Sequence, residues 1–107
     1  MLRIQRDDVD DHRAVLVPQG RIEAEWADLL ERECEALIRS GARVVLDLSD
    51  VVFIGRSGLE ALGRLHRAGV RIVSCSPLVV AMLEQEGIVA SRTPLPPSER
   101  QRTRNGS

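Results

Sequence analysis

Lysine and tyrosine are absent from this 107-residue sequence, which has only one phenylalanine and one tryptophan. Without lysine, the chain has neither a Schiff-base nucleophile nor the lysine of a phosphate-binding P-loop. Two aromatic side chains cannot build the stacking platform of a single-strand nucleic-acid binder. The formal net charge of -1 removes the basic surface on which duplex binding depends. We therefore expect no nucleic-acid partner.

Cysteine and histidine are also scarce, with two of each. Cys34, Cys75, His12 and His66 have none of the spacings of a zinc site, so we expect no metal and no cofactor. No apolar run approaches the 18 residues of a membrane span, and the first residues lack the apolar stretch of a signal peptide. We expect a cytoplasmic protein without membrane insertion, whose cysteines are free thiols in the core.

What remains is the composition of one soluble domain, 43% hydrophobic and 29% charged. Residues 1–91 carry regular apolar patterns and are predicted to form that domain. From Arg92 these patterns give way to three prolines and a run of polar and charged residues. Because such a segment has little to bury, residues 92–107 are predicted to be a disordered Pro/Arg-rich tail.

The apolar patterns predict strands alternating with helices. Two short strands, around Leu2–Ile4 and at residues 14–17, are expected on either side of an acidic turn, with Pro18 and Gly20 ending the second strand. Further along, we expect helices near residues 24–40, 57–68 and 78–86, strands at 43–49 and 70–75, and a short apolar segment at 51–54. This alternation is typical of a mixed sheet with helical crossovers.

The most informative polar group lies where the second of these helices begins. Ser57 and Glu60 form the S-x-x-E pattern of a capping box, which predicts that the serine hydroxyl caps the helix. The same hydroxyl is a candidate phosphorylation site, because the positive end of a helix dipole favours added negative charge. Arg56 could pair with that phosphate or face a partner. The residues alone leave both interpretations open.

An enzymatic role for Ser57 lacks the necessary companions. Gly55-Arg-Ser-Gly58 is similar to part of the G-x-S-x-G nucleophile elbow, but Leu59 replaces the last glycine. No aspartate follows Asp50, and His66 lies nine residues further along the same predicted helix. A nucleotide-binding role has no glycine-rich motif behind it. We therefore expect that the protein is not an enzyme.

A longer segment around Ser57 resembles a known family. Residues 44–62 read V-V-L-D-L-S-D-V-V-F-I-G-R-S-G-L-E-A-L. This run resembles the motif of STAS domains, the fold of anti-sigma factor antagonists, which typically reads V-V-L-D-L-S-x-V-x-F-I-D-S-S-G-L-x-x-L. Residues 20–23 resemble the family's G-E-L-D turn, with Glu23 at its acidic position, and residues 70–88 resemble the strand and helix that follow. Gly55 and Arg56 stand where the family has aspartate and the first serine of its pair.

This resemblance implies an α/β, STAS-like fold, in which a small mixed β-sheet has helices packed on one side. It also implies a bacterial transcription regulator that switches partners by binding a serine kinase that doubles as an anti-sigma factor. The serine phosphorylated in that mechanism aligns with Ser57. The alternative is a non-phosphorylated STAS subunit or scaffold of another complex, such as a lipid-transport ATPase, in which Ser57 only caps its helix. In the first case the candidate partner-binding residues are Glu23, Gly55, Arg56, Ser57, Gly58 and Glu60.

Overall fold

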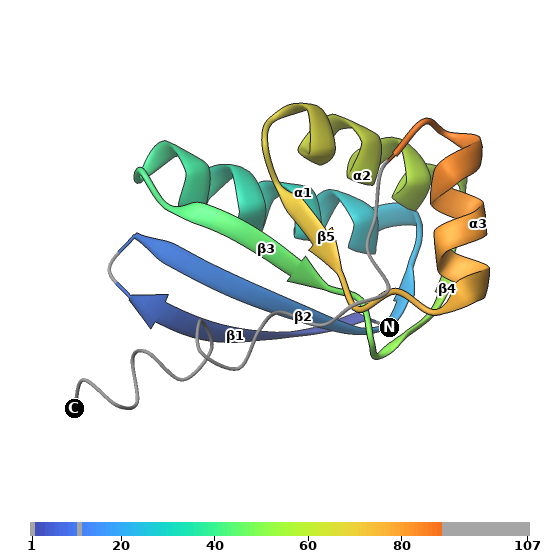
Figure 1. Cartoon of the computed structure of the whole chain (residues 1–107), viewed down its shortest axis with the longest axis horizontal. Helices are drawn as coiled ribbons and strands as arrows, with labels where there is room; N and C mark the ends of the chain where they lie inside the picture. Colours follow the sequence, from blue (N-terminus) through green and yellow to red (C-terminus); the bar gives the residue numbers. More distant parts are fainter. Residues whose placement is uncertain (1, 11, 89–107) are drawn as a thin grey trace.

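The computed structural model describes residues 2–10 and 12–88. These residues form five strands and three helices in the order β-β-α-β-β-α-β-α (Figure 1). The strands are β1 (Leu2–Asp10), β2 (Arg13–Ile22), β3 (Arg43–Asp47), β4 (Val51–Ile54) and β5 (Arg71–Val73). The helices are α1 (Ala24–Arg39), α2 (Arg56–Arg67) and α3 (Pro77–Gln85). The tail predicted over residues 92–107 lies outside the described residues.

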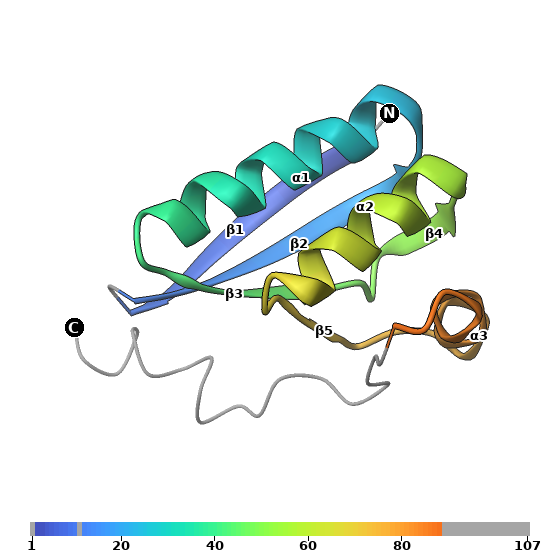
Figure 2. The same cartoon turned by 90° about the horizontal axis from the view of Figure 1, so that it is seen from above.

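The strands form one mixed sheet in the order β1-β2-β3-β5. β1 pairs antiparallel with β2, whereas β2 pairs parallel with β3, and β3 with β5. The short strand β4 also pairs parallel with β2, beyond the stretch that β3 occupies. Helices α1 and α2 lie side by side over one face of the sheet, and α3 lies beyond the end of its strands (Figure 2). The predicted fold class, a small mixed sheet with helices packed on one side, is confirmed.

The first hairpin is longer than the sequence predicts. The acidic run was expected to be a turn, but Asp7 and Asp8 belong to β1 and pair with Val15 and Ala14 of β2. Pro18 was expected to end the second strand and instead lies within it. β2 pairs with β3 along residues 13–16 and with β4 along residues 20–22, so Pro18 lies between the two parallel ladders. Its missing N–H therefore interrupts neither of them.

Helix α1 forms where the apolar spacing predicts it. Four of its residues share a buried face, spaced three or four positions apart: Ala27, Leu30, Cys34 and Leu37. The helix ends at Arg39 and is capped by Ser40, whose N–H and hydroxyl both bond to main-chain carbonyls of the last turn. Gly41 follows with φ +91°, a left-handed conformation that glycine adopts without steric cost. After this glycine the chain turns back and continues into β3.

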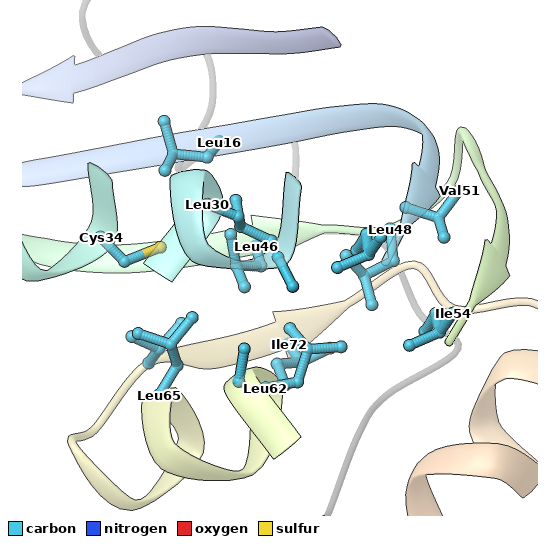
Figure 3. Packing of buried hydrophobic residues seen from close by; sticks show 14 of the residues in the cluster. Leu16, Leu30, Cys34, Leu46, Leu48, Val51, Ile54, Leu62, Leu65 and Ile72 are labelled. Carbon is cyan, nitrogen blue, oxygen red and sulfur yellow. The ribbon is translucent and has the colours of Figure 1, made fainter. Parts of the chain in front are cut away.

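The main core lies between the helices and the face of the sheet they cover. Leu30 of α1 and Leu62 and Leu65 of α2 point toward Leu46 of β3 and Ile72 of β5 (Figure 3). Each of these side chains is at most 3% exposed. Burying one such aliphatic side chain contributes roughly 1.5–3 kcal/mol. This core therefore holds α1 and α2 rigidly against the sheet, and with them the connections that begin each helix.

Candidate functional site

Two connections meet at the end of β2 where the candidate residues lie. The first links β2 to α1 through Glu23, and the second links β4 to α2 through Gly55. Because Ile22 and Ile54 are partners in the parallel pairing of β2 with β4, the connections leave the sheet side by side. The Gly55 N–H donates to the Ile22 carbonyl at 3.0 Å and joins them directly. The connections that begin α1 and α2 therefore lie next to each other, although they are distant in the sequence. Figure 1 shows both at the end of β2.

Ser57 is exposed, and it does not cap α2. The helix begins one residue earlier than predicted, at Arg56, and its N-cap is Gly55, in an extended conformation with no side-chain capping bond. The predicted capping box of Ser57 and Glu60 is therefore wrong. The first helical bond runs from the Leu59 N–H to the Gly55 carbonyl at 2.9 Å. Ser57 is the second residue of the helix, in the turn where backbone N–H groups have no partner within the helix.

Gly58 is buried, and its lack of a side chain allows α2 to approach β2. A Cβ at this position would overlap the carbonyl oxygen of Ile22 and lie 2.9 Å from Cγ2 of Ile54. Both neighbours belong to the sheet, so they cannot move aside cheaply. Gly58 thus fixes the first turn of α2 against the sheet. In doing so it positions the exposed candidate residues of that turn, Arg56, Ser57 and Glu60.

Glu23 and Gly55 are in contact across the two connections. A Cβ built on Gly55 would lie 3.0 Å from Cβ of Glu23 and 3.6 Å from its Oε2. The Glu23 carboxylate is also 3.8 Å from Nη1 of Arg21, and the Arg21 guanidinium lies 5.7 Å from the centre of the Phe53 ring. Any side chain at position 55 would therefore crowd an acidic group, and an aspartate there would set two carboxylates beside each other.

An exposed apolar pair lies beside these residues, and the sequence does not predict its exposure. The side chains of Val52 and Phe53, in β4, are 71% and 43% exposed. The apolar run of residues 51–54 gave no sign of this, because a continuous run is also typical of a fully buried strand. Only the pairing of β4 with β2 shows that Val51 and Ile54 face the core while the two residues between them do not. The apolar pair extends the exposed surface that begins at Arg56 and Ser57.

Four buried or half-buried polar and aromatic side chains outside these connections, and one half-buried histidine, have structural roles. Asp47 is 3% exposed, and one of its oxygens accepts a hydrogen bond from the Ser49 N–H at 3.0 Å. Cys34 and Cys75 are buried free thiols, as predicted. His66 is half-buried on α2, and Trp26 is half-buried against the main core.

The described part of the chain contains neither a candidate metal site nor a candidate membrane span. No three acidic, histidine or cysteine side chains in residues 2–10 and 12–88 come together to hold a metal ion. Within the same ranges, no helix has the length and apolarity needed to cross a membrane.

The architecture and the sequence both match known proteins. The family model described as the STAS domain matches residues 3–100. The structure superposes on the anti-sigma factor antagonist SpoIIAA in its unphosphorylated form with a TM-score of 0.74, at 19% identity over 96% of this chain and 97% of that one. An anti-sigma factor antagonist from Mycobacterium paratuberculosis matches with a TM-score of 0.65, at 23% identity over 91% of this chain and 86% of that one. No curated protein sequence matches the chain.

The two solved structures share the fold of this chain, at identities too low to transfer more than the fold. The family match covers nearly the whole chain, from β1 through α3, and includes both connections at the end of β2. It agrees with the resemblance of residues 44–62 to the family motif. The chain belongs to the STAS domain family.

Proposed function

We propose that this protein is an anti-sigma factor antagonist-like regulator, a bacterial, cytoplasmic protein that binds a protein partner and has no catalytic step of its own. The partner is a serine kinase that doubles as an anti-sigma factor, or a related scaffold. The observation that carries the proposal is the exposed hydroxyl of Ser57 on the second residue of α2, within a STAS domain. The similarity to two structures described as anti-sigma factor antagonists supports it.

Phosphorylation of Ser57 is the switch in this proposal. A phosphate adds between about -1.5 and -2 charges at pH 7. At the start of α2 it would lie near backbone N–H groups and the positive end of the helix dipole, which favour an anion. Since Ser57 makes no capping bond, modification would break no helix contact of its hydroxyl. The fold would persist while the charge of the docking surface changes, which is what a binding switch requires.

The docking surface consists of exposed or half-buried groups around that serine. Arg56, Ser57 and Glu60 contribute polar groups from α2, and Glu23 and Gly55 lie beside them. The exposed side chains of Val52 and Phe53 supply apolar area that a partner could bury. Aromatic and arginine side chains that become buried when two proteins bind are frequent anchors of protein interfaces. Phe53 and Arg56 are therefore the strongest candidates for such anchors on this surface.

A second candidate function rests on Gly55 and Arg56. These residues stand where the family has an aspartate and a serine, so the kinase would meet a glycine and an arginine before Ser57. That difference favours a non-phosphorylated STAS subunit or scaffold of another complex, such as a lipid-transport ATPase. The docking surface would be the same, but Ser57 would remain an unmodified hydroxyl.

The two functions are separated by mapping phosphate on the protein. The full chain is incubated with ATP and a candidate serine kinase of the anti-sigma factor type from the same organism, and the modified residue is identified by mass spectrometry, with Ser57→Ala as the control. Phosphate on Ser57 that is absent from the Ser57→Ala protein supports the switch. A chain that binds the partner tightly yet stays unmodified contradicts the switch and supports the scaffold.

A further inference from the structure

Strand β1 forms a long edge of the sheet. It has nine residues, lies first in the strand order and pairs with β2. Within residues 2–10 and 12–88, no strand pairs with its other side, which we call the outer edge of β1. Main-chain N–H and C=O groups along such an edge are a template for pairing with a further strand. The outer edge of β1 is therefore suited to accept one.

The pairing of β1 with β2 shows which main-chain groups face this outer edge. Leu2 lies opposite Gly20, and Ile4 lies opposite Pro18, which has no N–H. The Gly20 N–H donates to the carbonyl of Asp50, just before β4, and so points away from β1. Hydrogen-bonded and non-hydrogen-bonded positions alternate along an antiparallel pair. Leu2 and Ile4 therefore direct their main-chain groups away from β2, toward the outer edge.

The side chains between these positions carry opposite charges, placed symmetrically. Arg3 and Gln5 are exposed, and Asp7 is half-buried. They alternate with Leu2 and Ile4, which pack in the main core, so they lie on the face of the sheet opposite the helices. Gln5 is midway between the two charges. A second β1 strand, laid antiparallel about Gln5, would place Arg3 of each copy opposite Asp7 of the other.

We propose that the protein forms a homodimer in which two β1 strands pair antiparallel about a two-fold axis at Gln5. The two sheets join into one, with the helices of both copies on the same face. Main-chain groups of Leu2 and Ile4 in each copy bond to the other strand. Arg3 and Asp7 then face each other at non-hydrogen-bonded positions, where cross-strand side chains approach most closely. The two Gln5 amides meet at the axis, where each can donate to the other.

The charges favour this register over its neighbours. Because the core side chains must stay on one face, the strands can shift only in steps of two residues. A shift in one direction places Arg6 of one copy opposite Arg6 of the other, and like charges directly opposite are destabilising. A shift in the other direction places Arg3 opposite Gln5 and leaves no pair of opposite charges. The sequence of β1 therefore specifies pairing about Gln5.

Helix α1 adds apolar area on the same side of the molecule. Figure 2 shows α1 on the β1 side of α2. Glu31 faces α2, since its carboxylate accepts hydrogen bonds from Arg64. Trp26, five residues earlier, lies on the other flank of the buried face of α1 and thus toward β1. Trp26 and Leu29 are both half-buried, so each keeps apolar area that a second copy could bury.

The dimer leaves the proposed docking surface accessible. β1 and β4 pair with opposite edges of β2, and the docking surface lies on β4 and the start of α2. Each dimer would therefore present that surface twice. Since the two surfaces are separate, dimerisation and the proposed function can each fail without the other.

Sedimentation equilibrium of the full chain tests the proposal. We expect a dimeric mass at high micromolar concentration, and a monomeric mass throughout that range would overturn the proposal. Arg3→Glu places two pairs of carboxylates opposite each other and should raise the dimer dissociation constant at least about tenfold. Arg32→Glu makes the same change of charge at an exposed position of α1 and should dimerise like the wild type. Equal dissociation constants for the two variants would place the contact elsewhere and refute the proposal.

Mixing two variants gives a second test, whose positive result misfolding cannot produce. Asp7→Arg places two pairs of arginines opposite each other and should also weaken the dimer. In a mixture of Arg3→Glu and Asp7→Arg chains, the introduced glutamate faces the introduced arginine, and Asp7 of the first chain faces Arg3 of the second. The heterodimer should therefore form at least about tenfold more tightly than either homodimer. Failure of the two chains to associate on mixing would refute the pairing of β1 with β1.

Discussion

Gly58 leaves no room for a side chain against the backbone carbonyl of Ile22, where α2 begins and β2 ends. No other residue type fits, because even a Cβ would overlap that oxygen and lie 2.9 Å from Cγ2 of Ile54. The contact joins the helix that carries Ser57 to the connection that carries Glu23. The geometry of the proposed docking surface therefore depends on a residue that contributes no side chain to it.

Substituting Gly58 tests this dependence. Gly58→Ala should destabilise the fold by about 3 kcal/mol or more, because the clash is with the sheet and not with a flexible side chain. Gly63→Ala is the matched control in the same helix, where the nearest atoms would lie at 3.6 and 3.9 Å. It should stabilise the protein by about 0.5–1 kcal/mol, the usual gain of alanine over glycine in a helix. Urea unfolding measures both, and equal effects would contradict the close approach.

The ion pair between α1 and α2 should make stability depend on pH. Arg64 donates to both Glu31 oxygens, from Nε at 2.7 Å and from Nη2 at 2.9 Å. These hydrogen bonds hold the pKa of Glu31 below its ordinary value of 4.5, despite the opposing effect of burial. A carboxyl whose pKa is lower in the folded state stabilises the fold above its unfolded-state pKa, and this contribution is lost as the pH falls through the folded-state value.

Glu31→Gln should therefore lower the thermal midpoint at pH 7, and its difference from the wild type should shrink toward pH 2. Glu35→Gln, at an exposed position of the same helix, serves as the control and should change the midpoint little. Thermal unfolding followed by circular dichroism over this pH range gives both differences. A deficit of Glu31→Gln that stays constant from pH 7 to pH 2 would mean that the ion pair does not cause it.

The two cysteines should be inert in the folded protein. Burial raises the pKa of Cys34 to about 12, with nearby glutamates adding to the shift. Burial, followed by the charge of Asp47, raises the pKa of Cys75 to about 11. Because the thiolate is the reactive form, both should react with a disulfide reagent at pH 8 at least about 100-fold more slowly than free cysteine. Rapid release of two thiol equivalents without denaturant would refute this, whereas both should react in guanidinium chloride.

Ser74 is a position where a smaller residue should stabilise the protein. Its φ is +60°, in the left-handed region, and its buried hydroxyl oxygen has no hydrogen-bond partner among residues 2–10 and 12–88. Ser74→Gly relieves the backbone strain and removes the unsatisfied group, against the larger chain entropy of glycine when unfolded. We expect a net gain of about 1 kcal/mol in urea unfolding. Ser49→Gly, at an exposed position, should give no gain, and a loss of stability in Ser74→Gly would contradict the interpretation.

The sequence predicts elements whose formation is governed by local patterns. Helix α1 follows from apolar residues at three- and four-residue steps and from Gly41 at its end, and the structure places both as predicted. Strand β3 follows likewise from its continuous apolar run. The extension of β2 through Pro18 could not be predicted, because it depends on where β3 and β4 pair along it.

The start of α2 shows the same limit at the candidate site. Gly55 and Ser57 are both acceptable N-cap residues, so the local sequence allows two starting points for the helix. The choice is made by a tertiary contact, the hydrogen bond from the Gly55 N–H to the Ile22 carbonyl. The identity of Ser57 as the notable hydroxyl could be read from the sequence. Its exposure and the neighbouring exposed side chains of Val52 and Phe53 required the arrangement of the strands.

The central claim is that charge on Ser57 controls partner binding, and equilibrium binding of Ser57→Asp tests it most directly. Titration calorimetry with the unmodified kinase partner compares Ser57→Asp with wild type, with Ser57→Ala, and with Ser40→Asp, which adds the same charge at the end of α1. We predict that Ser57→Asp weakens binding at least about tenfold, or about 1.4 kcal/mol. Ser57→Ala and Ser40→Asp should bind like the wild type. Wild-type affinity in Ser57→Asp would contradict the claim.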